Sequence, residues 1–326
     1  MSTATWQQIL AQSTITLQQL TTRLDLPSSW AQTHGLVDPR FPLRAPEPFI
    51  ARMQKSDPAD PLLLQVLPQR FELAQQPGYS FDPLLEQRYS PVPGLIHKYH
   101  KRALLTLTGA CAIHCRYCFR QHFPYHDNQA LTEHWDDIIQ YLTTHTHINE
   151  VILSGGDPLI LKDQLLQKVI DKLTCLPHIT RLRIHTRLPI VIPQRITLSL
   201  TKCLSEAPIP VILVIHSNHS NELNSSVAHA LEQLKHPNIT LLNQSVLLKG
   251  VNDHVDTLVT LSERLFAMGV LPYYLHTLDK VAGAAHFDLS LQHAKSLHTK
   301  MAGQLPGFLL PRLVSDIPNK SAKTLQ

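Results

Sequence analysis

The sequence predicts an α/β fold in which the strands of a parallel sheet alternate with amphipathic helices. The first sign is six short apolar runs, at residues 104–108, 150–154, 181–186, 211–217, 240–246 and 272–276. Helical patterns separate them, at residues 132–143, 161–175, 193–205, 221–234 and 255–268, the first with Thr132 as its N-cap. Strands and helices in this order form parallel sheets. A doubly wound sheet and a barrel both fit, although no Gly-x-Gly-x-x-Gly motif supports a dinucleotide-binding version.

Two regions flank this array. Residues 5–23 carry apolar side chains at helical spacing, with an interruption at Ser13 and Thr14. Residues 39–93 contain too many prolines for regular structure beyond short helices, such as one at 48–55, and their apolar anchors indicate a segment that wraps the main body. The predicted organisation is an N-terminal helical and proline-rich wrap (1–98), a core (99–289), and a C-terminal helix with a tail (290–326).

The composition argues against several classes of protein. The chain has 326 residues, 43% hydrophobic content and a net charge of +4, which suits a packed globule, and its dispersed Lys and Arg do not predict a nucleic-acid partner. It has no apolar run of about 18 residues and no signal-peptide pattern, so we expect a cytoplasmic location and no membrane partner. Two of the five cysteines, Cys175 and Cys203, are isolated, as reduced thiols in a core would be.

The other three cysteines, Cys111, Cys115 and Cys118, lie together on the loop after the first predicted strand. Thiolates this close in sequence can bind one face of an iron–sulfur cluster, and a cluster held by three thiolates keeps one iron open for chemistry. The alternative is a zinc site completed by a histidine, because His114 lies within the loop and the chain has 20 His. The spacing favours the cluster, since it is not that of a paired Cys-x-x-Cys zinc site.

The loop reads Cys-x-x-x-Cys-x-Tyr-Cys, which resembles the signature of radical S-adenosylmethionine (SAM) enzymes, with Tyr117 in the aromatic position. Residues 94–102 and 118–125 are similar to the lysine 2,3-aminomutases, and most similar to the bacterial branch that makes β-lysine for elongation factor P. The similarity runs from about Phe49 to the C-terminus. The chain is therefore identified as a member of this family.

The resemblance implies a fold, a set of cofactors and a reaction. The fold is a partial (β/α)6 TIM-like barrel of the radical SAM type, with its chemistry at the C-terminal ends of the strands. The cofactors are a [4Fe-4S] cluster, S-adenosyl-L-methionine and pyridoxal 5′-phosphate. The reaction is a 1,2-amino migration that converts L-α-lysine to β-lysine, with pyridoxal phosphate as electron sink. The implied partners are L-lysine, an external electron donor, and elongation factor P with its lysine ligase.

The resemblance also assigns residues to the cluster and to SAM. The three cysteines match the cluster ligands, and Tyr117 matches a residue near the adenine. The end of the second strand matches the segment that holds the SAM amino group in the family. Two glycines in this segment would let the backbone approach a ligand closely. By itself that stretch would be interpreted as a tight turn. The residues matched to the SAM pocket are Tyr117, Ser154, Gly155, Gly156, Asp157, His216 and Gln244.

Further residues match the substrate and pyridoxal phosphate sites. Arg120 matches an arginine for the substrate α-carboxylate, which its planar guanidinium suits. Arg102 matches one that contacts the cofactor phosphate. Asp279 and Asp316 match two aspartates that bind the ε-ammonium of lysine, and paired carboxylates suit a desolvated cation.

The lysine that binds pyridoxal phosphate covalently is expected in the tail. Lys323 is followed by Thr and lies seven residues after Asp316, as in the family. Residues 318–322 replace the glycine-rich run found in the broader family, and Lys320 is a rival. Without the resemblance, either lysine would be interpreted as part of a frayed, solvated tail.

Two other functions remain open from the sequence. One is a radical SAM enzyme that acts on another substrate without pyridoxal phosphate. The other is a zinc-stabilised binding protein in which the cysteines are structural. The iron or zinc content of the protein, and a cofactor adduct trapped at Lys323, would distinguish these two functions from that of a lysine 2,3-aminomutase.

Overall fold

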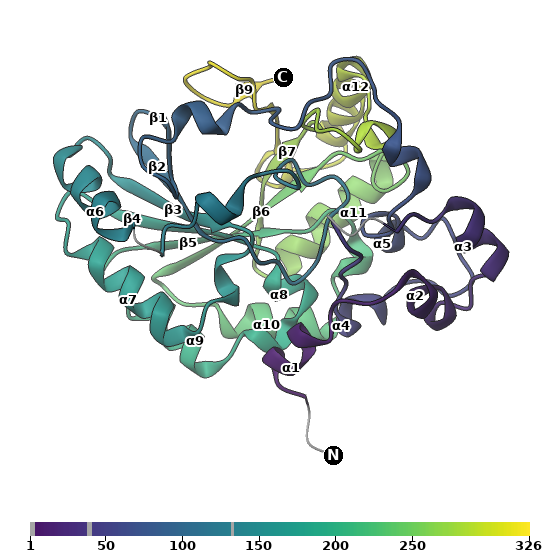
Figure 1. The fold of residues 1–326 in the computed structure, drawn as a ribbon, viewed down its shortest axis with the longest axis horizontal. Coiled ribbons are helices and arrows are strands. Elements are labelled where there is room, and N and C mark those ends of the chain that lie inside the picture. Colours follow the sequence, from purple (N-terminus) through teal and green to yellow (C-terminus); the bar gives the residue numbers. More distant parts are fainter. Residues whose placement is uncertain (1–3, 38–40, 132–133) are drawn as a thin grey trace.

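The structure, a computed structural model, describes residues 4–37, 41–131 and 134–326 and is built around one nine-stranded sheet (Figure 1). The strands follow one another across the sheet in the order of the sequence. The strands from β2 to β8 are parallel, while β1 and β9 pair antiparallel at the two edges. Their bounds are β1 (Leu95–Tyr99), β2 (Arg102–Thr108), β3 (Glu150–Gly155), β4 (Arg181–Thr186), β5 (Val211–His216), β6 (Ile239–Val246), β7 (Leu271–His276), β8 (Arg312–Ser315) and β9 (Thr324–Leu325).

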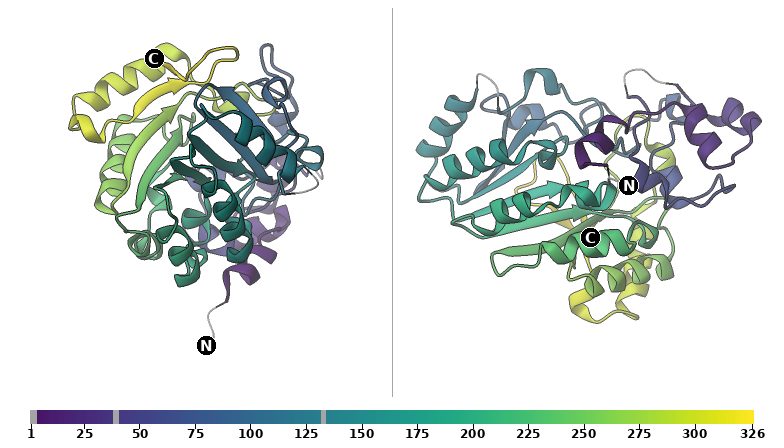
Figure 2. Two further views of the ribbon diagram at one scale, coloured as in Figure 1. Left: turned by 90° about the vertical axis from the view of Figure 1, so that its left-hand side faces the viewer. Right: turned by 90° about the horizontal axis from the view of Figure 1, so that it is seen from below.

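The strand order decides between the two architectures that the sequence leaves open. A doubly wound sheet reverses its order at a switch point, whereas a barrel keeps sequential order with its helices outside. Here the order never reverses, and Figure 2 shows helices along the outer side of a curved sheet. Among the described residues β1 and β9 do not pair, so the barrel is partial, as predicted. The outer helices are α6 (Trp135–Thr144), α7 (Asp163–Thr174), α9 (Leu198–Ser205), α10 (Ser225–Gln233), α11 (Val255–Ala267) and α12 (Leu291–Ala302).

The parallel strands have one apolar face and one polar face. Side chains directed toward the helices, such as Leu153, Leu182 and Ile184, belong to the main hydrophobic core. Alternate residues of the same strands face the barrel interior, because successive side chains of a strand point to opposite sides. On β4 these alternate residues are Arg183 and His185, which line a cavity. The sheet therefore separates a structural core from a polar interior.

All six predicted strands are present, each within two residues of its predicted bounds. The helix predicted at 193–205 is divided into a 3-10 turn (Pro193–Arg195) and α9, and a separate short helix, α8 (Leu188–Val191), precedes it. The division follows from Pro193, which has no N–H for a helix interior, and from Thr197, whose side chain accepts from the Leu200 N–H and starts α9. Thr132, the predicted N-cap, lies outside the described residues.

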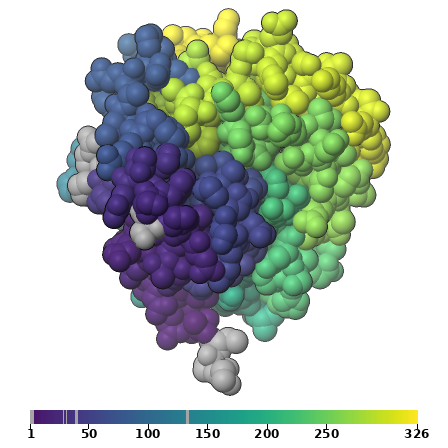
Figure 3. Space-filling view, turned by 90° about the vertical axis from the view of Figure 1, so that its right-hand side faces the viewer, coloured from purple at the N-terminus to yellow at the C-terminus, as the bar shows by residue number. Residues whose placement is uncertain are grey.

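The N-terminal part of the chain packs against the barrel rather than extending from it. Figure 3 shows residues 4–90 (purple to blue) spread over one side of the molecule, beside the green residues of the barrel. Ser13 and Thr14 do break the helical pattern, as expected, and Thr14 forms a β-bridge with Arg44. The segment contains α1 (Trp6–Ala11), α2 (Leu17–Arg23), α3 (Ser28–His34), α4 (Glu47–Ile50) and α5 (Pro61–Leu64).

The proline-rich segment holds the loop that carries the cysteines. The N–H groups of His114 and Arg116 donate to the carbonyls of Arg44 and Gln65, at 3.0 and 2.9 Å. The Arg116 guanidinium forms a buried ion pair with Glu72. Across the described residues, no helix has both the length and the apolar character needed to cross a membrane.

Candidate active site

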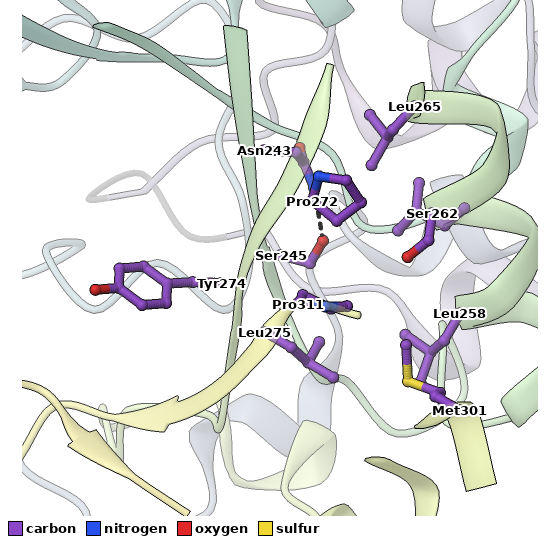
Figure 4. A pocket seen from close by; sticks show the side chains of 11 residues that line it. Asn243, Ser245, Leu258, Ser262, Leu265, Pro272, Tyr274, Leu275, Met301 and Pro311 are labelled. Carbon is purple, nitrogen blue, oxygen red and sulfur yellow. Dashed lines mark hydrogen bonds between the residues drawn. The ribbon is translucent and has the colours of Figure 1, made fainter. Parts of the chain in front are cut away.

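A cavity of about 590 Å3 lies at the C-terminal ends of the parallel strands. Its size is within the range of about 300–1,000 Å3 that is common for ligand sites. A second hollow, between β6, β7 and α11, measures only about 10 Å3 and is lined largely by apolar side chains such as Leu258, Leu265 and Met301 (Figure 4). Such a hollow holds one water at most. The candidate site is therefore the larger cavity.

The loop after β2 brings the three predicted cluster ligands to the wall of this cavity. Cys111, Cys115 and Cys118 all line it, and none forms a disulfide. Burial raises the pKa of Cys111 well above its usual range and that of Cys118 to about 12, and neighbouring thiols contribute to both shifts. Buried thiols this close together ionise together only when a cation neutralises them. The donor set therefore fits the iron of a cluster.

The surroundings of the loop do not support the zinc alternative. In the part of the chain that the structure describes, no group of three or more His, Cys, Asp or Glu is placed to hold a single metal ion. A cluster spreads its ligands over several irons, so cysteines that cannot share one ion can still bind it. His114 instead stacks on Phe41, with ring centroids 4.5 Å apart, and its Nδ1 hydrogen-bonds the Pro42 carbonyl at 2.8 Å.

Two glycines allow the end of β3 to pack against the cysteine loop. Gly155 has φ +115°, and a Cβ there would lie 2.5 Å from the Thr108 carbonyl oxygen. A Cβ on Gly156 would overlap the carbonyl of Ala110. Only glycine permits such contact between two backbones. The glycines that the resemblance assigns to SAM therefore also fix the position of the loop that begins at Cys111.

The Asp157 carboxylate is fully engaged by its own chain. One oxygen accepts from the Thr186 hydroxyl at 2.7 Å and from the Leu159 N–H at 3.0 Å. The other accepts from the N–H groups of Arg187 and Leu188, at 2.8 and 3.2 Å. Burial raises its pKa to about 6 in spite of these bonds. The side chain thus ties the end of β3 to the end of β4.

Tyr117 and His216 meet on one side of the cavity. The two rings stack with centroids 5.7 Å apart, and the Tyr117 hydroxyl lies 2.8 Å from His216 Nε2. Burial and the nearby Arg187 lower the pKa of His216 to about 3, so the imidazole is neutral. Gln244 pairs with His216 across β5 and β6 and lines the same cavity.

Arg120 is buried beside the cluster loop and already faces a carboxylate. Its Nε and Nη2 donate to the two oxygens of Glu86, each at 2.7 Å, and its Nη1 donates to the Ser154 hydroxyl at 3.0 Å. Such bidentate pairs are the strongest of the arginine contacts. Glu86, from the proline-rich segment, was not singled out from the sequence, because a lone acid among prolines carries no local signal.

The tail is held by a strand, and its last lysine reaches the cavity. β9 begins directly after Lys323 and pairs with β8. Lys323 Nζ lies 2.8 Å from one oxygen of Asp316, and Lys98 Nζ lies 2.6 Å from the other. Although burial alone would raise the pKa of Asp316, these lysines lower it to about 2. Lys323 lines the cavity, whereas Lys320 is exposed.

Asp279 and Arg102 complete the set of predicted residues on the cavity wall. Burial raises the pKa of Asp279 to about 7, while Lys323 acts against that rise. The Arg102 guanidinium lies over the Tyr99 ring, 4.6 Å from its centroid. All of the predicted site residues therefore line one cavity, although they are spread over more than 200 positions of the chain.

Comparison with known proteins agrees with this geometry. A family model described as a 4Fe-4S single cluster domain matches residues 101–177. The chain is 49% identical over 284 residues to an L-lysine 2,3-aminomutase of Escherichia coli (strain K12), which covers 87% of this chain and 83% of that protein. It is 45% identical over 320 residues to the L-lysine 2,3-aminomutase of Haemophilus influenzae, or 98% and 95% of the two chains.

The chain belongs to the L-lysine 2,3-aminomutase family. It is therefore an isomerase of the iron–sulfur, radical SAM type. More distant aminomutases match as well, such as that of Clostridium subterminale at 36% identity over 85% of this chain and 66% of that one. Among solved structures, a radical SAM methyltransferase from Sphaerobacter thermophilus aligns over 68% of each chain with 13% identity and a TM-score of 0.44.

A buried network behind the cysteine loop was not predicted from the sequence. Arg187 Nη1 lies 2.6 Å from Cys115 Sγ and 2.8 Å from the Tyr117 hydroxyl. Arg187 Nη2 donates to Gln65 at 2.6 Å and to Glu222 at 3.1 Å. The one signal was a charged residue at the end of an apolar strand. Its partners could not be found, because they come from positions far apart in the chain.

Proposed function

We propose that the chain converts L-α-lysine to β-lysine by moving an amino group from Cα to Cβ, with a [4Fe-4S] cluster, SAM and pyridoxal phosphate. The observation that carries this proposal is that three cysteines, the Lys323–Asp316 pair and Asp279 line one cavity. Radical chemistry on an amine needs the radical source and the substrate side by side, away from water. The names of the relatives agree with lysine as the substrate.

The chain contributes binding and orientation in this scheme. When bound, the cofactors supply the hydrogen-abstracting radical and the π-system that carries the migrating nitrogen. Cys111, Cys115 and Cys118 would hold the cluster, which when bound would supply an iron for SAM. Arg102 binds the phosphate of pyridoxal phosphate. The residues proposed to form the SAM pocket are Tyr117, Ser154, Gly155, Gly156, Asp157, His216 and Gln244.

The two ends of the substrate lysine bind to two separate sets of charged side chains, acidic ones at the ε-ammonium and a basic one at the α-carboxylate. Asp316 already accepts two ammonium groups, those of Lys98 and Lys323, so its carboxylate is suited to the substrate ε-ammonium once Lys323 turns to the cofactor. Asp279 ionises when that ammonium arrives, because a nearby cation favours the charged form. Arg120 binds the α-carboxylate from the side of its Nη1, while Glu86 holds the rest of the guanidinium in place.

Lys323, rather than Lys320, carries pyridoxal phosphate in this proposal. Its support is that Lys323 lines the cavity while Lys320 is exposed. Borohydride reduction of the loaded protein, followed by peptide mass spectrometry, should find the pyridoxyl group on Lys323. Lys320→Ala should keep that adduct and Lys323→Ala should lose it. An adduct at Lys320 would reverse the assignment.

A direct assay tests the reaction. Anaerobically reconstituted protein, incubated with labelled L-lysine, SAM and a reductant, should release labelled β-lysine. Omission of pyridoxal phosphate should abolish the product. If SAM is cleaved but lysine is unchanged with or without pyridoxal phosphate, the chain is a radical enzyme for another substrate. Purified protein that carries zinc and no iron would refute the proposal altogether.

The wider setting of the reaction is also part of the proposal. The product β-lysine serves the lysine ligase that modifies elongation factor P, and an external donor supplies the electron in the cytoplasm. Addition of purified ligase and elongation factor P to the assay should increase the mass of elongation factor P. If its mass does not change, the β-lysine formed here does not serve that modification. Limited proteolysis tests the division into residues 1–98, 99–289 and 290–326, which should be cut first near its boundaries.

A further inference from the structure

The floor of the cavity carries a row of cationic and polar side chains that no motif explains. β4 alternates, so that Leu182 and Ile184 are buried in the core while Arg183 and His185 line the cavity. Arg181 continues the same row outside the cavity, with 43% of its side chain exposed. These side chains lie on the strand that faces the cofactor site, but the proposed function assigns no role to them.

Positive charge on this floor exceeds negative charge. Arg181 and Arg183 both pair with a single carboxylate, that of Glu150 on β3. Arg102, from β2, lies over the Tyr99 ring, and within the described residues no carboxylate pairs with it. Because Arg181 lies outside the cavity and is half-exposed, Glu150 balances Arg183 on the floor, and Arg102 leaves one positive charge in excess. Buried charge of one sign is costly unless a ligand neutralises it.

The other arginines of the cavity have no such excess. Arg120 is neutralised by Glu86 and Arg187 by Glu222, each through a buried ion pair. Asp316, by contrast, is shared by two lysines and adds no spare negative charge to the floor. The charge that lacks a carboxylate is therefore that of Arg102.

Two buried nitrogens of the row have no hydrogen-bond partner among the described residues. These are Arg183 Nε and His185 Nε2. Leaving a buried polar group unpaired costs about 1–3 kcal/mol, and native structures contain few such groups. Burial lowers the pKa of His185 well below its usual range, with Arg183 and Lys323 contributing, so the ring is neutral. His185, Arg183 and Lys323 all line the same cavity.

Arg102 and Arg183 are close enough to act on one ligand. Their strands are separated only by β3, and Arg183 lies two residues beyond the position in register with Arg102, so the two Cα atoms are roughly 12 Å apart. Both guanidinium groups influence the ionisation of Tyr273, where each opposes the rise in pKa that burial causes. Both arginines line the same cavity.

We propose that Arg183 is a second phosphate-binding arginine, which with Arg102 and His185 forms the seat of the pyridoxal phosphate phosphoryl group. This inference rests on the proposed function and adds a positioning residue to it. A phosphoryl group, with its negative charge and several acceptor oxygens, balances the spare charge of Arg102 and supplies acceptors for the unpaired nitrogens of Arg183 and His185. The seat fixes the cofactor at the end remote from Lys323.

The test compares pyridoxal phosphate with pyridoxal, which lacks the phosphate. Both are titrated into the cluster-reconstituted full chain, and bound cofactor is measured by absorbance and by borohydride-trapped adduct. Arg183→Gln should raise the dissociation constant for pyridoxal phosphate by about 10- to 100-fold, the worth of one charge-assisted contact, and leave that for pyridoxal unchanged. Arg181→Gln is the matched control, because it shares Glu150 but lies outside the cavity, and should retain the wild-type preference.

A measurement on the wild-type protein covers the case in which Arg183→Gln does not fold. Inorganic phosphate should compete with pyridoxal phosphate and should not compete with pyridoxal. The inference is overturned if Arg183→Gln keeps the wild-type preference, if it loses both ligands equally, or if inorganic phosphate does not compete. In those cases the wild type still binds pyridoxal phosphate, so the proposed function survives. A wild-type protein that binds neither ligand overturns both.

Discussion

Removal of the Arg187 guanidinium should be among the most damaging single changes outside the hydrophobic core. Arg187 and Glu222 are buried, with 6% and 0% of their side chains exposed. Glu222 also accepts from the Asn218 N–H at 2.8 Å, so it cannot turn toward solvent when its partner is lost. Removing one member of such a pair leaves a buried charge, at a cost of about 3–5 kcal/mol. This is a large share of the roughly 5–15 kcal/mol that stabilises a typical protein.

Arg187→Met tests this reasoning through urea denaturation, followed by circular dichroism under anaerobic conditions. The free energy of unfolding should fall by about 3–5 kcal/mol. Lys202→Met is the matched control, because Lys202 and Glu206 form a pair 3.9 Å apart with about 70% of each side chain exposed, and such pairs contribute at most about 1 kcal/mol. The double variant Arg187→Met/Glu222→Gln should lose less than the sum of the two single changes.

The reasoning is refuted if Arg187→Met is no less stable than the surface control. It is also refuted if the double variant shows simple additivity, because the cost is attributed to an uncompensated Glu222 charge. A loss of stability that Glu222→Gln does not relieve would assign the role of Arg187 to its contacts with Cys115 and Tyr117.

Three further predictions concern other parts of the molecule. Gly156→Ala should displace the cysteine loop and lower the iron bound after reconstitution, measured per chain, while Gly307→Ala, with nothing within 4 Å, should not. Burial raises the pKa of Asp279 to about 7, so the stability contributed by its protonated form is lost as pH rises from about 4 to 7. Asp279→Asn should therefore show a smaller fall in melting temperature between pH 5 and 8 than the wild type. An equal fall in the two proteins would contradict this prediction. Trp6→Ala removes the ring 4.6 Å from the buried Arg195 guanidinium and should cost about 3 kcal/mol, with faster proteolysis near the N-terminus as the check.

The sequence predicts the parts of the fold that depend on local patterns. The six strands follow from apolar runs, and the order of strands and helices predicts the parallel sheet. β1, β8 and β9 were missed, because β1 has only two apolar residues before His97 and Lys98, β8 has only four residues after Pro311, and β9 has only two residues. None of the three is long enough to show a period, and each forms only because a neighbouring strand offers a partner.

The features of the site also divide into those that a local sequence pattern predicts and those that depend on partners far away in the chain. The cysteine spacing and the offset between Asp316 and Lys323 are local, and the sequence identified both. The partners of Arg120 and Arg187 are not local, since Glu86 and Gln65 come from the proline-rich segment. Asp157 shows an intermediate case. The proline that follows it is a helix-start signal and could have indicated that its carboxylate caps the turn at Pro158–Ile160.

The proline-rich segment supplies counter-charges as well as cover. Glu72 neutralises Arg116, Glu86 neutralises Arg120, and Gln65 accepts from Arg187. A barrel trimmed of residues 41–90 would therefore leave Arg116 and Arg120 without their carboxylates and Arg187 without one of its acceptors. Minimal versions of this enzyme cannot be obtained by excising the strands and helices alone. Engineering for size must preserve this segment or replace the arginines together with it.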